Sequence, residues 1–403
     1  PISREYLATL RADLTRRMEI LQGELSRLVG KPLNPNSGPQ VAAYLFEDLG
    51  LPIRGRTEGG KPSTDEDVIK AFAFGEEQNA FCQKLLEYRK VAKTLSTYVD
   101  GLLKWVDPFD RIHTSYSTTQ VTGRLASKEP NLQNLPKVSE DPYKIRGCLQ
   151  TQPGRVFIVS DYSQIEMRLL AVASEDGDMI SAINHGLDLH SMTGATLANI
   201  SYEEFIKRKK ANDPEAILYR EAAKAVGFGI VYGITKYALS AQLSEKMKRY
   251  VSEEEAQKYI DAYLNRFPGV RTYMAMRQHE ARTQGFVQTI FGRRRRLSKA
   301  KSKKGAERGY AERQSVNAPI QGSAGDLVKK MMIFFSADAY LRECLGFFLI
   351  HQVHDELVFE GPEENAEAAL RHIKEVMEDP FPDDPLPVKI IADPKIARSY
   401  KDA

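Results

Sequence analysis

Two stretches of β-branched and aromatic residues, separated by a long helical region, constrain the fold of this chain most strongly. Residues 155–160 (RVFIVS) and 347–360 (FFLIHQVHDELVFE) have the composition of strands, and a further strand is expected at 111–116 (RIHTSY). Residues 178–290 are expected to form helices. A sheet interrupted by a helical insertion predicts an α+β domain from which a second domain emerges.

The first third of the chain is expected to be helical and to carry no catalytic cluster. Leucines and a methionine at helical spacing predict one long amphipathic helix over residues 3–29. A turn-rich stretch at 54–63 precedes a second helical region, which is expected to run to about Leu103.

Composition limits the class of protein only loosely. A length of 403 residues fits two or three domains, and a net charge of +3 does not by itself indicate nucleic-acid binding. Cys82, Cys148 and Cys344 are scattered and odd in number, which predicts reduced core thiols with neither a disulfide nor a zinc site.

No apolar run approaches the roughly 18–20 residues of a membrane span, and the first residues do not resemble a signal peptide. We therefore expect a cytoplasmic protein, for which a phage, bacterial or organellar origin would each fit. Because the chain does not begin with Met, we expect it to be a fragment of a longer chain.

Asp161 follows the strand predicted at 155–160 directly. A carboxylate at the end of a buried strand is held rigidly at an exposed rim, and this suits a metal ligand. The alternative is a turn residue, because Ser163 and Glu166 match a capping box that would begin a helix.

A second acidic position, His354-Asp355-Glu356, joins two apolar strands. Adjacent acids there are costly unless the turn is exposed or a cation neutralises them. A simple hairpin turn would more commonly contain Gly or Asn. If both strands lie in one sheet, Asp161 and Asp355 converge and can hold two Mg²⁺ ions for an in-line phosphoryl displacement. Mg²⁺ needs few protein carboxylates, because it keeps waters and takes phosphate oxygens.

A helix within YREAAKAVGFGIVYG carries a third candidate group. Arg220, Lys224, Phe228 and Tyr232 are four residues apart, so they lie along one face. The cations suit a triphosphate and the aromatic rings suit a base, although an ordinary amphipathic helix with a solvated basic edge has the same pattern. Two glycines inside the helix, Gly227 and Gly229, predict a close approach by another group or a bend.

A basic run follows at Arg293–Arg296, with Lys299, Lys301, Lys303 and Lys304. It is a candidate contact for a phosphate backbone. A solvated loop and a targeting-like patch explain it equally well.

These segments together resemble the polymerase domain of the family A DNA polymerases, the DNA polymerase I group. DYSQIEMRLLA, beginning at Asp161, resembles motif A; Arg220 to Gly233 resembles motif B; and VHDE at 353–356 resembles motif C. Further matches occur in order along nearly the whole chain: TGRLAS (122–127), NLQN (131–134), DLH (188–190), ERQSVNAPIQGSAGD (312–326) and the early YRKVAKTLSTYVD segment.

The resemblance implies a right-hand fold with an antiparallel-sheet palm, helical fingers and a helical thumb. The implied divisions are thumb 1–106, palm 107–175 and 305–403, and fingers 176–304. Nothing in the chain resembles the carboxylate set of an exonuclease, so we expect no 3′–5′ proofreading.

The resemblance also implies roles at matching positions. Asp161 and Asp355 would hold two Mg²⁺ ions, with Mn²⁺ as a substitute, and Glu356 would be an accessory acid. Residues of the nucleotide site would be Arg220, Lys224 and His190 at the triphosphate, Phe228 and Tyr232 at the base and template, and, as weaker members, Gln164 and Tyr162. Lys224 would also protonate the leaving pyrophosphate. Glu166, expected one helical turn beyond Asp161, would crowd a ribose 2′-hydroxyl. Residues that would follow primer, template and minor groove are Arg124, Asn131, Gln133, Arg313, Asn317, Gln321 and His354.

Motif B departs from many bacterial relatives at two positions. Gly227 stands where they have a polar residue, which could loosen the helix and alter fidelity. Phe228, where some relatives have Tyr, predicts that nucleotides without a 3′-hydroxyl are disfavoured.

The implied activity is DNA-templated extension of a primer 3′-hydroxyl with dNTPs and release of pyrophosphate, with primer–template DNA as partner and the protein as a monomer. A single-subunit RNA polymerase is the nearest alternative, and Glu166 argues against it. A catalytically idle DNA-binding module is the second alternative, although every acid needed for the chemistry is present. Reverse transcription as a side activity, accessory proteins, and a role in replication or in repair stay open.

Overall fold

The fold is that of a computed structural model, which describes residues 1–74, 78–136, 138, 141–247 and 249–403. The chain forms two compact units. Unit 1 contains Pro1–Ser115, Ser127–Pro153 and Ala397–Ala403, and unit 2 contains Tyr116–Ala126 and Gly154–Ile396.

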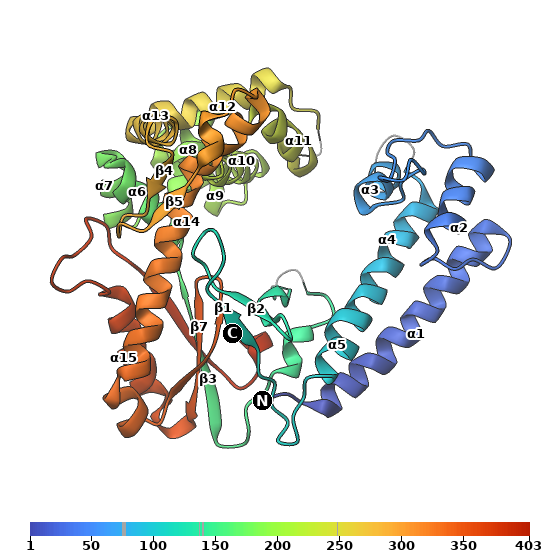
Figure 1. The fold of residues 1–403 in the computed structure, drawn as a ribbon, viewed down its shortest axis with the longest axis horizontal. Coiled ribbons are helices and arrows are strands. Elements are labelled where there is room, and N and C mark those ends of the chain that lie inside the picture. Colours follow the sequence, from blue (N-terminus) through green and yellow to red (C-terminus); the bar gives the residue numbers. More distant parts are fainter. Residues whose placement is uncertain (75–77, 137, 139–140, 248) are drawn as a thin grey trace. The chain divides into compact units, whose positions relative to one another are not determined.

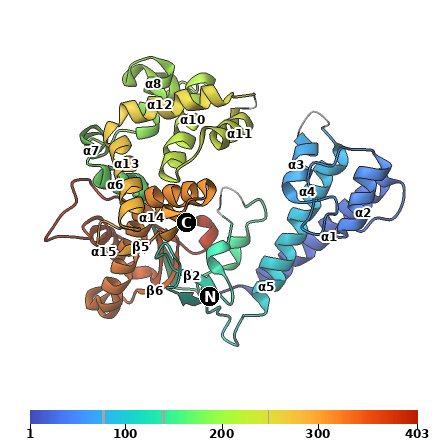
Figure 2. The ribbon, with the colours of Figure 1, turned by 45° about the horizontal axis from the view of Figure 1, so that its top comes forward.

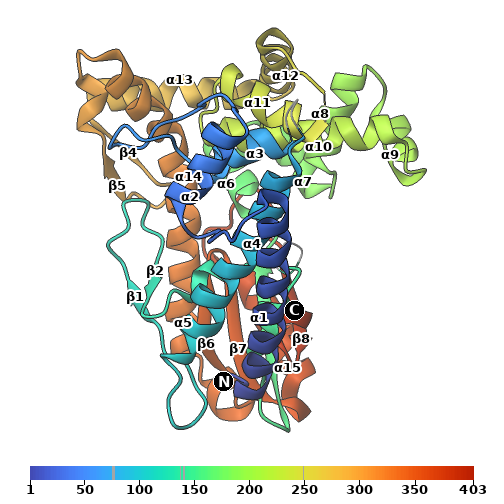
Figure 3. The same cartoon turned by 90° about the vertical axis from the view of Figure 1, so that its right-hand side faces the viewer.

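Unit 1 is built around a long helix, α1 (Arg4–Val29), which runs beside α4 (Ala80–Lys93) (Figure 3). Its leucines recur at helical spacing and are buried: Leu7, Leu14, Leu21 and Leu25. The Ser3 side chain accepts a hydrogen bond from Tyr6 N–H at the start, and Gly30 ends the helix with a φ of 75°. The amphipathic helix predicted over residues 3–29 is therefore confirmed, with both of its ends capped.

The other elements of unit 1 are short. They are α2 (Gly38–Ala42), η1 (Ala43–Asp48), α3 (Glu66–Phe74), η2 (Thr94–Val99), α5 (Asp100–Leu103), η3 (Leu132–Asn134), η5 (Ile145–Cys148) and η9 (Tyr400–Asp402). Strands β1 (Ser115–Ser117) and β2 (Ala126–Lys128) form a two-stranded sheet.

Unit 2 contains a four-stranded sheet of order β6-β7-β3-β8, with strands β3 (Arg155–Tyr162), β6 (Phe348–Val353), β7 (Glu356–Pro362) and β8 (Ala392–Ala397). Both β3 and β6 pair with β7 in antiparallel fashion. The strands predicted at 155–160 and 347–360 are thus confirmed, and they belong to one sheet although about 190 residues separate them in sequence.

The sheet packs against α14 (Gly305–Ala337) and α15 (Ala366–Glu378) (Figure 1). Alternate residues of β3 and β7, among them Ile158 and Phe359, belong to one hydrophobic core with both helices. The Phe359 ring lies edge-on to Phe335 of α14, with centroids 4.9 Å apart. This core holds the central strands, and with them the acidic residues at their ends.

Helices α6 to α13 gather at one end of α14 (Figures 1 and 2). They are α6 (Ile165–Ser174), α7 (Gly177–Asn184), α8 (Leu189–Ala198), α9 (Tyr202–Lys210), α10 (Pro214–Val231), α11 (Lys236–Met247), α12 (Glu253–Arg266) and α13 (Pro268–Thr283). After them come β4 (Phe286–Gln288), β5 (Arg294–Arg296) and η6 (Ser298–Lys301), and nearer the C-terminus η7 (Tyr340–Cys344) and η8 (Glu363–Asn365).

Three local predictions need correction. Only the end of the strand predicted at 111–116 is part of β1, because Ile112 makes just an isolated bridge to Val106. The helical region expected to reach residue 290 ends at Thr283, and the β4–β5 hairpin begins soon after it. Cys344 is exposed, whereas Cys82 and Cys148 are buried as predicted.

In the part of the chain that the structure describes, none of the helices combines the length and the apolarity needed to cross a bilayer.

Candidate active site

Strand pairing brings the two acidic segments together. In the β3–β7 register Asp161 lies opposite Glu356, and the backbone N–H of Tyr162 donates to the carbonyl oxygen of Asp355 at 3.4 Å. Asp161 is exposed and Asp355 is partly buried. The predicted convergence of Asp161 and Asp355 at one end of one sheet is therefore what the fold produces.

The segment after Asp161 does not form the predicted capping box. Helix α6 begins at Ile165, and its N-cap is Gln164, which has a φ of 50° and provides no side-chain hydrogen bond to the helix. Glu166 is thus the second helical residue and does not lie one helical turn beyond Asp161, which is still in β3. The tight left-handed turn directs Glu166 inward, where only 9% of its side chain is exposed.

Arg124 contacts the buried Glu166 and also Asp355. Its Nη2 lies 2.7 Å from Glu166 Oε1 and 3.3 Å from Asp355 Oδ1. Burial by itself would lower the pKa of the guanidinium, but the two carboxylates outweigh burial and raise it. We call Arg124, Glu166 and Asp355 the sheet-edge cluster. In this structure Arg124 balances carboxylate charge, a role that the sequence did not predict for it.

Glu166 has a second partner in Tyr232, the C-cap of α10, whose hydroxyl donates to Glu166 Oε2 at 3.1 Å. Burial raises the pKa of Glu166, with a further rise from Asp355 that Arg124 and Tyr232 oppose. Burial and the neighbouring Glu166 raise the pKa of Tyr232 to about 12, so this phenol stays protonated and remains a donor. Motif A and motif B are thereby joined through side chains.

Helix α10 presents its candidate residues along one side, as predicted. Arg220, Lys224 and Phe228 are partly exposed and Tyr232 is exposed, whereas the residues between them are mostly buried. The helix starts after Asp213, whose side chain accepts from Glu215 N–H, with Pro214 at the first helical position. Four residues per step therefore place two cations and two aromatic rings on the accessible face.

Arg220 is held by Asp188, which precedes α8. Arg220 Nε lies 2.8 Å from Asp188 Oδ2, and Lys209 Nζ lies 3.4 Å from the same oxygen. Burial raises the pKa of Asp188, but hydrogen bonds from Arg220 and Ser191 and the charge of Arg220 outweigh it and lower the pKa. We call Asp188, Lys209 and Arg220 the α8–α10 cluster. Asp188 was missed as a site residue, although the DLH motif contains it.

His190 lies on α8 against Phe228, with ring centroids 5.6 Å apart. The imidazole is buried, and burial lowers its pKa to about 4, with smaller contributions in the same direction from Arg220 and Lys224 that Asp188 opposes. His190 is therefore neutral at pH 7 and can donate or accept one hydrogen bond beside the cations of α10.

The chain itself approaches Gly229 closely and makes an ordinary contact at Gly227. A Cβ at Gly229 would lie 2.7 Å from Ile234 Cγ2, and one at Gly227 would lie 3.4 Å from the Tyr263 ring. The prediction of a close approach is confirmed at Gly229, where Ile234 folds back over the end of α10, and not at Gly227.

Three candidate DNA contacts follow one another at four-residue steps on α14: Arg313, Asn317 and Gln321. Arg313 is exposed and packs beneath Gly233, where a Cβ would lie 3.0 Å from Arg313 Cβ. Asn317 is only 6% exposed, and its buried amide nitrogen has no hydrogen-bond partner among the described residues. An amide held in this way is available to a ligand that supplies an acceptor.

The two candidates from NLQN lie in unit 1. The Asn131 side chain accepts from Gln133 N–H and so begins η3, and Gln133 Oε1 accepts from Ser127 N–H at 3.2 Å. Both side chains shape their own loop.

The remaining candidates are divided between surface and core. Gln164 and His354 are exposed, and each has a left-handed backbone, with φ values of 50° and 52°. Glu356 is partly buried beside Asp161 in the β3–β7 register. Tyr162 is 3% exposed within the core, so this conformation does not present its ring to a nucleotide.

The donor set at the sheet edge fits Mg²⁺. Asp161 and Asp355 supply carboxylate oxygens at neighbouring backbone positions, and an exposed edge leaves room for water and phosphate oxygens. The described residues contain no group of three or more His, Cys, Asp or Glu side chains arranged to hold a metal. A site with two protein carboxylates, in which water and phosphate oxygens supply the other ligands, agrees with the exposed donor set and with the lack of a larger ligand group among the described residues.

The basic run at Arg293–Arg296 is not a simple solvated loop, which was one of the three interpretations that the sequence left open. Most of it forms β5, which pairs with β4. Arg293 is engaged within the protein, since its Nε lies 2.8 Å from Asp326 Oδ1 and its Nη2 donates to the Thr122 carbonyl at 2.7 Å. Sequence gave no signal for this pairing, because Asp326 is 33 residues away.

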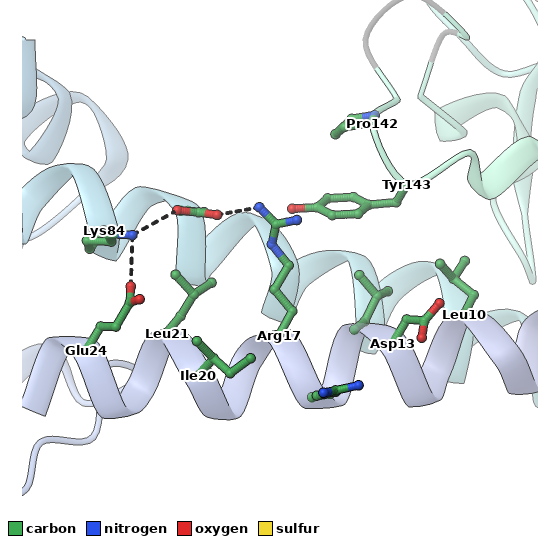
Figure 4. A pocket seen from close by; sticks show the side chains of 12 residues that line it. Leu10, Asp13, Arg17, Ile20, Leu21, Glu24, Lys84, Pro142 and Tyr143 are labelled. Carbon is green, nitrogen blue, oxygen red and sulfur yellow. Dashed lines mark hydrogen bonds and ion pairs between the residues drawn. The ribbon is translucent and has the colours of Figure 1, made fainter.

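A separate cavity of about 560 Å³ lies in unit 1 between α1, α4 and the segment around Tyr143 (Figure 4). Four of its charged side chains are paired: Lys84 contacts Glu24 at 2.8 Å, and Arg17 contacts Glu87 at 2.5 Å near the Tyr143 ring. These pairs stabilise the packing of the two helices. The candidate active site is the sheet edge of unit 2.

Known proteins are similar to this chain over nearly its whole length. Residues 4–402 match DNA polymerase family A. The thermostable DNA polymerase I of Thermus aquaticus is 38% identical over 380 residues, which cover 94% of this chain and 43% of that protein. DNA polymerase I of Geobacillus stearothermophilus is also 38% identical over 380 residues, with 94% and 41% covered. The chain thus spans less than half the length of these relatives.

A solved structure shares the whole fold. The POL domain of Pol1 from M. smegmatis, in complex with DNA primer-template and dNTP, matches with a TM-score of 0.87 and 33% identity, covering 100% of this chain and 67% of that one. The chain belongs to DNA polymerase family A. Its fold is accordingly the predicted α+β right-hand polymerase fold.

Proposed function

We propose that this chain extends the 3′-hydroxyl of a DNA primer with dNTPs on a DNA template and releases pyrophosphate. The main observation that supports this proposal is that the β3–β7 register brings Asp161 and Asp355 to one end of a sheet within unit 2. Similarity to DNA polymerase I and to the M. smegmatis POL domain, which is in complex with DNA primer-template and dNTP, supports primer–template DNA and dNTPs as the partners. We propose that the protein acts as a monomer.

Asp161 and Asp355 are the residues proposed to hold two Mg²⁺ ions, with Mn²⁺ as a substitute. When bound, such ions lower the pKa of the primer hydroxyl and neutralise the charge of the triphosphate. Glu356, opposite Asp161, adds a third carboxylate at this end of the sheet.

The α10 face is proposed to bind the incoming nucleotide. Arg220 and Lys224 attract the triphosphate, and the neutral His190 adds a hydrogen bond. To reach a phosphate, Arg220 exchanges or shares its contact with Asp188. Phe228 and Tyr232 offer ring faces to the base pair, and Lys224 is the proposed donor of a proton to pyrophosphate.

Glu166 is proposed to select deoxyribose. Its carboxylate is fixed by Arg124 and by the Tyr232 hydroxyl, so it cannot easily move aside for a 2′-hydroxyl. Arg313, Asn317 and Gln321 on α14, with Arg124, Asn131, Gln133 and His354, are the proposed contacts to primer and template. Gln164 lies near the nucleotide in this proposal.

We also propose the family's division of labour along the chain: thumb 1–106, palm 107–175 and 305–403, and fingers 176–304. Deletions or insertions confined to one division should then alter DNA affinity, chemistry or nucleotide binding respectively.

The testing experiment is Mg²⁺-dependent extension of a labelled primer on a DNA template, offered dNTPs or rNTPs in parallel. Efficient extension with dNTPs alone is expected. Preferential use of rNTPs would indicate an RNA polymerase, and DNA binding without extension would indicate an idle binding module. A primer with a mismatched 3′ end tests the expected absence of proofreading.

A further inference from the structure

Arg293 connects three segments of unit 2 that are distant in sequence. Its Nε lies 2.8 Å from Asp326 Oδ1 on α14, and its Nη2 donates to the Thr122 carbonyl at 2.7 Å. The Arg293 side chain is 32% exposed and that of Asp326 14%, so the pair is partly shielded from water. A planar guanidinium that donates in two directions fixes both partners relative to each other.

Two glycines make the space for this guanidinium. A Cβ at Gly123, which has a φ of 81°, would lie 2.3 Å from Arg293 Cζ, and a Cβ at Gly322 would lie 2.6 Å from its Nη2. These distances are shorter than van der Waals contact. The guanidinium therefore fits between the backbone at Gly123 and the backbone of α14 because both lack a side chain.

The residue that follows Gly123 is Arg124 of the sheet-edge cluster. The backbone of this residue also lies against α14, since a Cβ at Gly325 would be 3.3 Å from Arg124 N. Both carboxylate contacts of Arg124 come from a single atom, Nη2, and its buried Nε has no hydrogen-bond partner among the described residues. Because one guanidinium nitrogen makes both contacts, the placement of Arg124 depends also on the main chain at 122–124.

We infer that Arg293, held by Asp326, is a positioning residue that sets Arg124 between Glu166 and Asp355. The contacts run from Asp326 through Arg293 to the Thr122 carbonyl, and from there along the chain to Arg124. This inference rests on the proposed function. It separates Arg293 from its basic neighbours on β5, because its guanidinium is turned to the protein and not to a phosphate backbone.

The first test is Arg293→Lys, which keeps the charge but cannot donate in two fixed directions. Single-turnover extension at saturating primer–template and dNTP is expected to slow by about tenfold, because a small displacement of a catalytic group has a large effect on rate. The dissociation constant of primer–template and its dependence on salt should stay as in the wild type. A weaker, less salt-dependent DNA complex with an unchanged rate would show a phosphate contact and overturn the inference.

The second test changes the geometry without touching a charge. Gly322→Ala places a Cβ 2.6 Å from Arg293 Nη2 and 2.7 Å from Thr289 Cγ2, and the flexible end of the arginine can move away. The same slowing as in Arg293→Lys is expected. Gly305→Ala is the matched control on the same helix, because a Cβ there has no neighbour within 4 Å, and its rate should equal that of the wild type.

The third test distinguishes positioning from general stability. Arg124→Ala is expected to slow extension by about 100-fold, and adding Arg293→Lys to it should change the rate by less than about twofold. If the two effects multiply fully, or if Arg293→Lys only lowers the melting temperature while the folded enzyme keeps its rate, the inference is wrong. Wild-type protein in the same assay separates the two proposals: without wild-type extension the proposed function fails, and with it an unaffected Arg293→Lys refutes only the positioning role.

Discussion

The sheet-edge cluster and the α8–α10 cluster have opposite charge arrangements. In the first, one cation, Arg124, contacts two carboxylates. In the second, one carboxylate, Asp188, contacts two cations, Lys209 and Arg220. Arg220 also lies 3.4 Å from Glu221, but that side chain is 42% exposed and such a pair contributes little.

The difference in charge indicates which kind of ligand each cluster attracts. The sheet edge has an excess of negative charge, which Asp161 and Glu356 increase, and it therefore attracts cations. The α10 face has an excess of positive charge, to which Lys224 adds, and it attracts an anion such as a triphosphate. The two clusters are linked by Tyr232, which extends from the end of α10 to Glu166.

The largest effect is expected at the sheet edge. Asp161→Ala or Asp355→Ala should reduce extension by at least about 1,000-fold, because each removes a proposed metal ligand, while primer–template binding stays nearly unchanged. Rapid-quench extension and a filter-binding titration measure the two quantities. Asp178→Ala, which removes an exposed acid paired with Arg266, is the control. Substantial activity in either active-site variant would refute the metal assignment.

A smaller effect is expected on the α10 face. Arg220→Ala should raise the KM for dNTP by about 10- to 100-fold, the value of one charge-assisted hydrogen bond, with a lesser change in kcat. Arg208→Ala removes a cation of α9 that pairs with Glu204, and it should leave the KM as it is. An unchanged KM in Arg220→Ala would mean that Asp188 keeps Arg220 in a structural role.

Phe228→Tyr examines selectivity on the same face. The added hydroxyl can take the place of a missing 3′-hydroxyl, so incorporation of chain terminators relative to dNTPs should rise by about tenfold or more. Competition between dideoxynucleotides and dNTPs in primer extension measures this ratio. Equal discrimination by both proteins would remove the assigned role of Phe228.

A further effect concerns stability and not catalysis. His190 has a folded pKa of about 4 and an ordinary value of 6.5, so the unfolded state binds more protons between these values. Stability is therefore lost as the pH falls from 6.5 to 4, by up to about 3 kcal/mol from this residue. His190→Gln should show a weaker loss in urea unfolding over this range. Parallel curves for the two proteins would contradict the burial of a neutral imidazole.

Much of the fold was predictable from local patterns. The spacing of leucines gave the helix at 3–29, and β-branched runs gave the central strands. Arg220, Lys224, Phe228 and Tyr232 were placed on one face correctly because helical spacing fixes which side chains share a face. The predictions were less accurate at short strands such as β1, β4 and β5, because pairing with a partner strand decides whether such strands form.

The sequence by itself determined which segments tend to form helices and strands, the order of these segments, and which acidic and basic side chains they carry. It could not determine partners across long separations, because hydrogen bonds and ion pairs leave no local signal. Tertiary structure alone decided that Glu166 is buried between Arg124 and Tyr232, that Asp188 holds Arg220, and that Arg293 contacts Asp326. It also decided the meeting of Asp161 with Asp355, since only the β3–β7 register places two residues 355 − 161 = 194 positions apart at one edge.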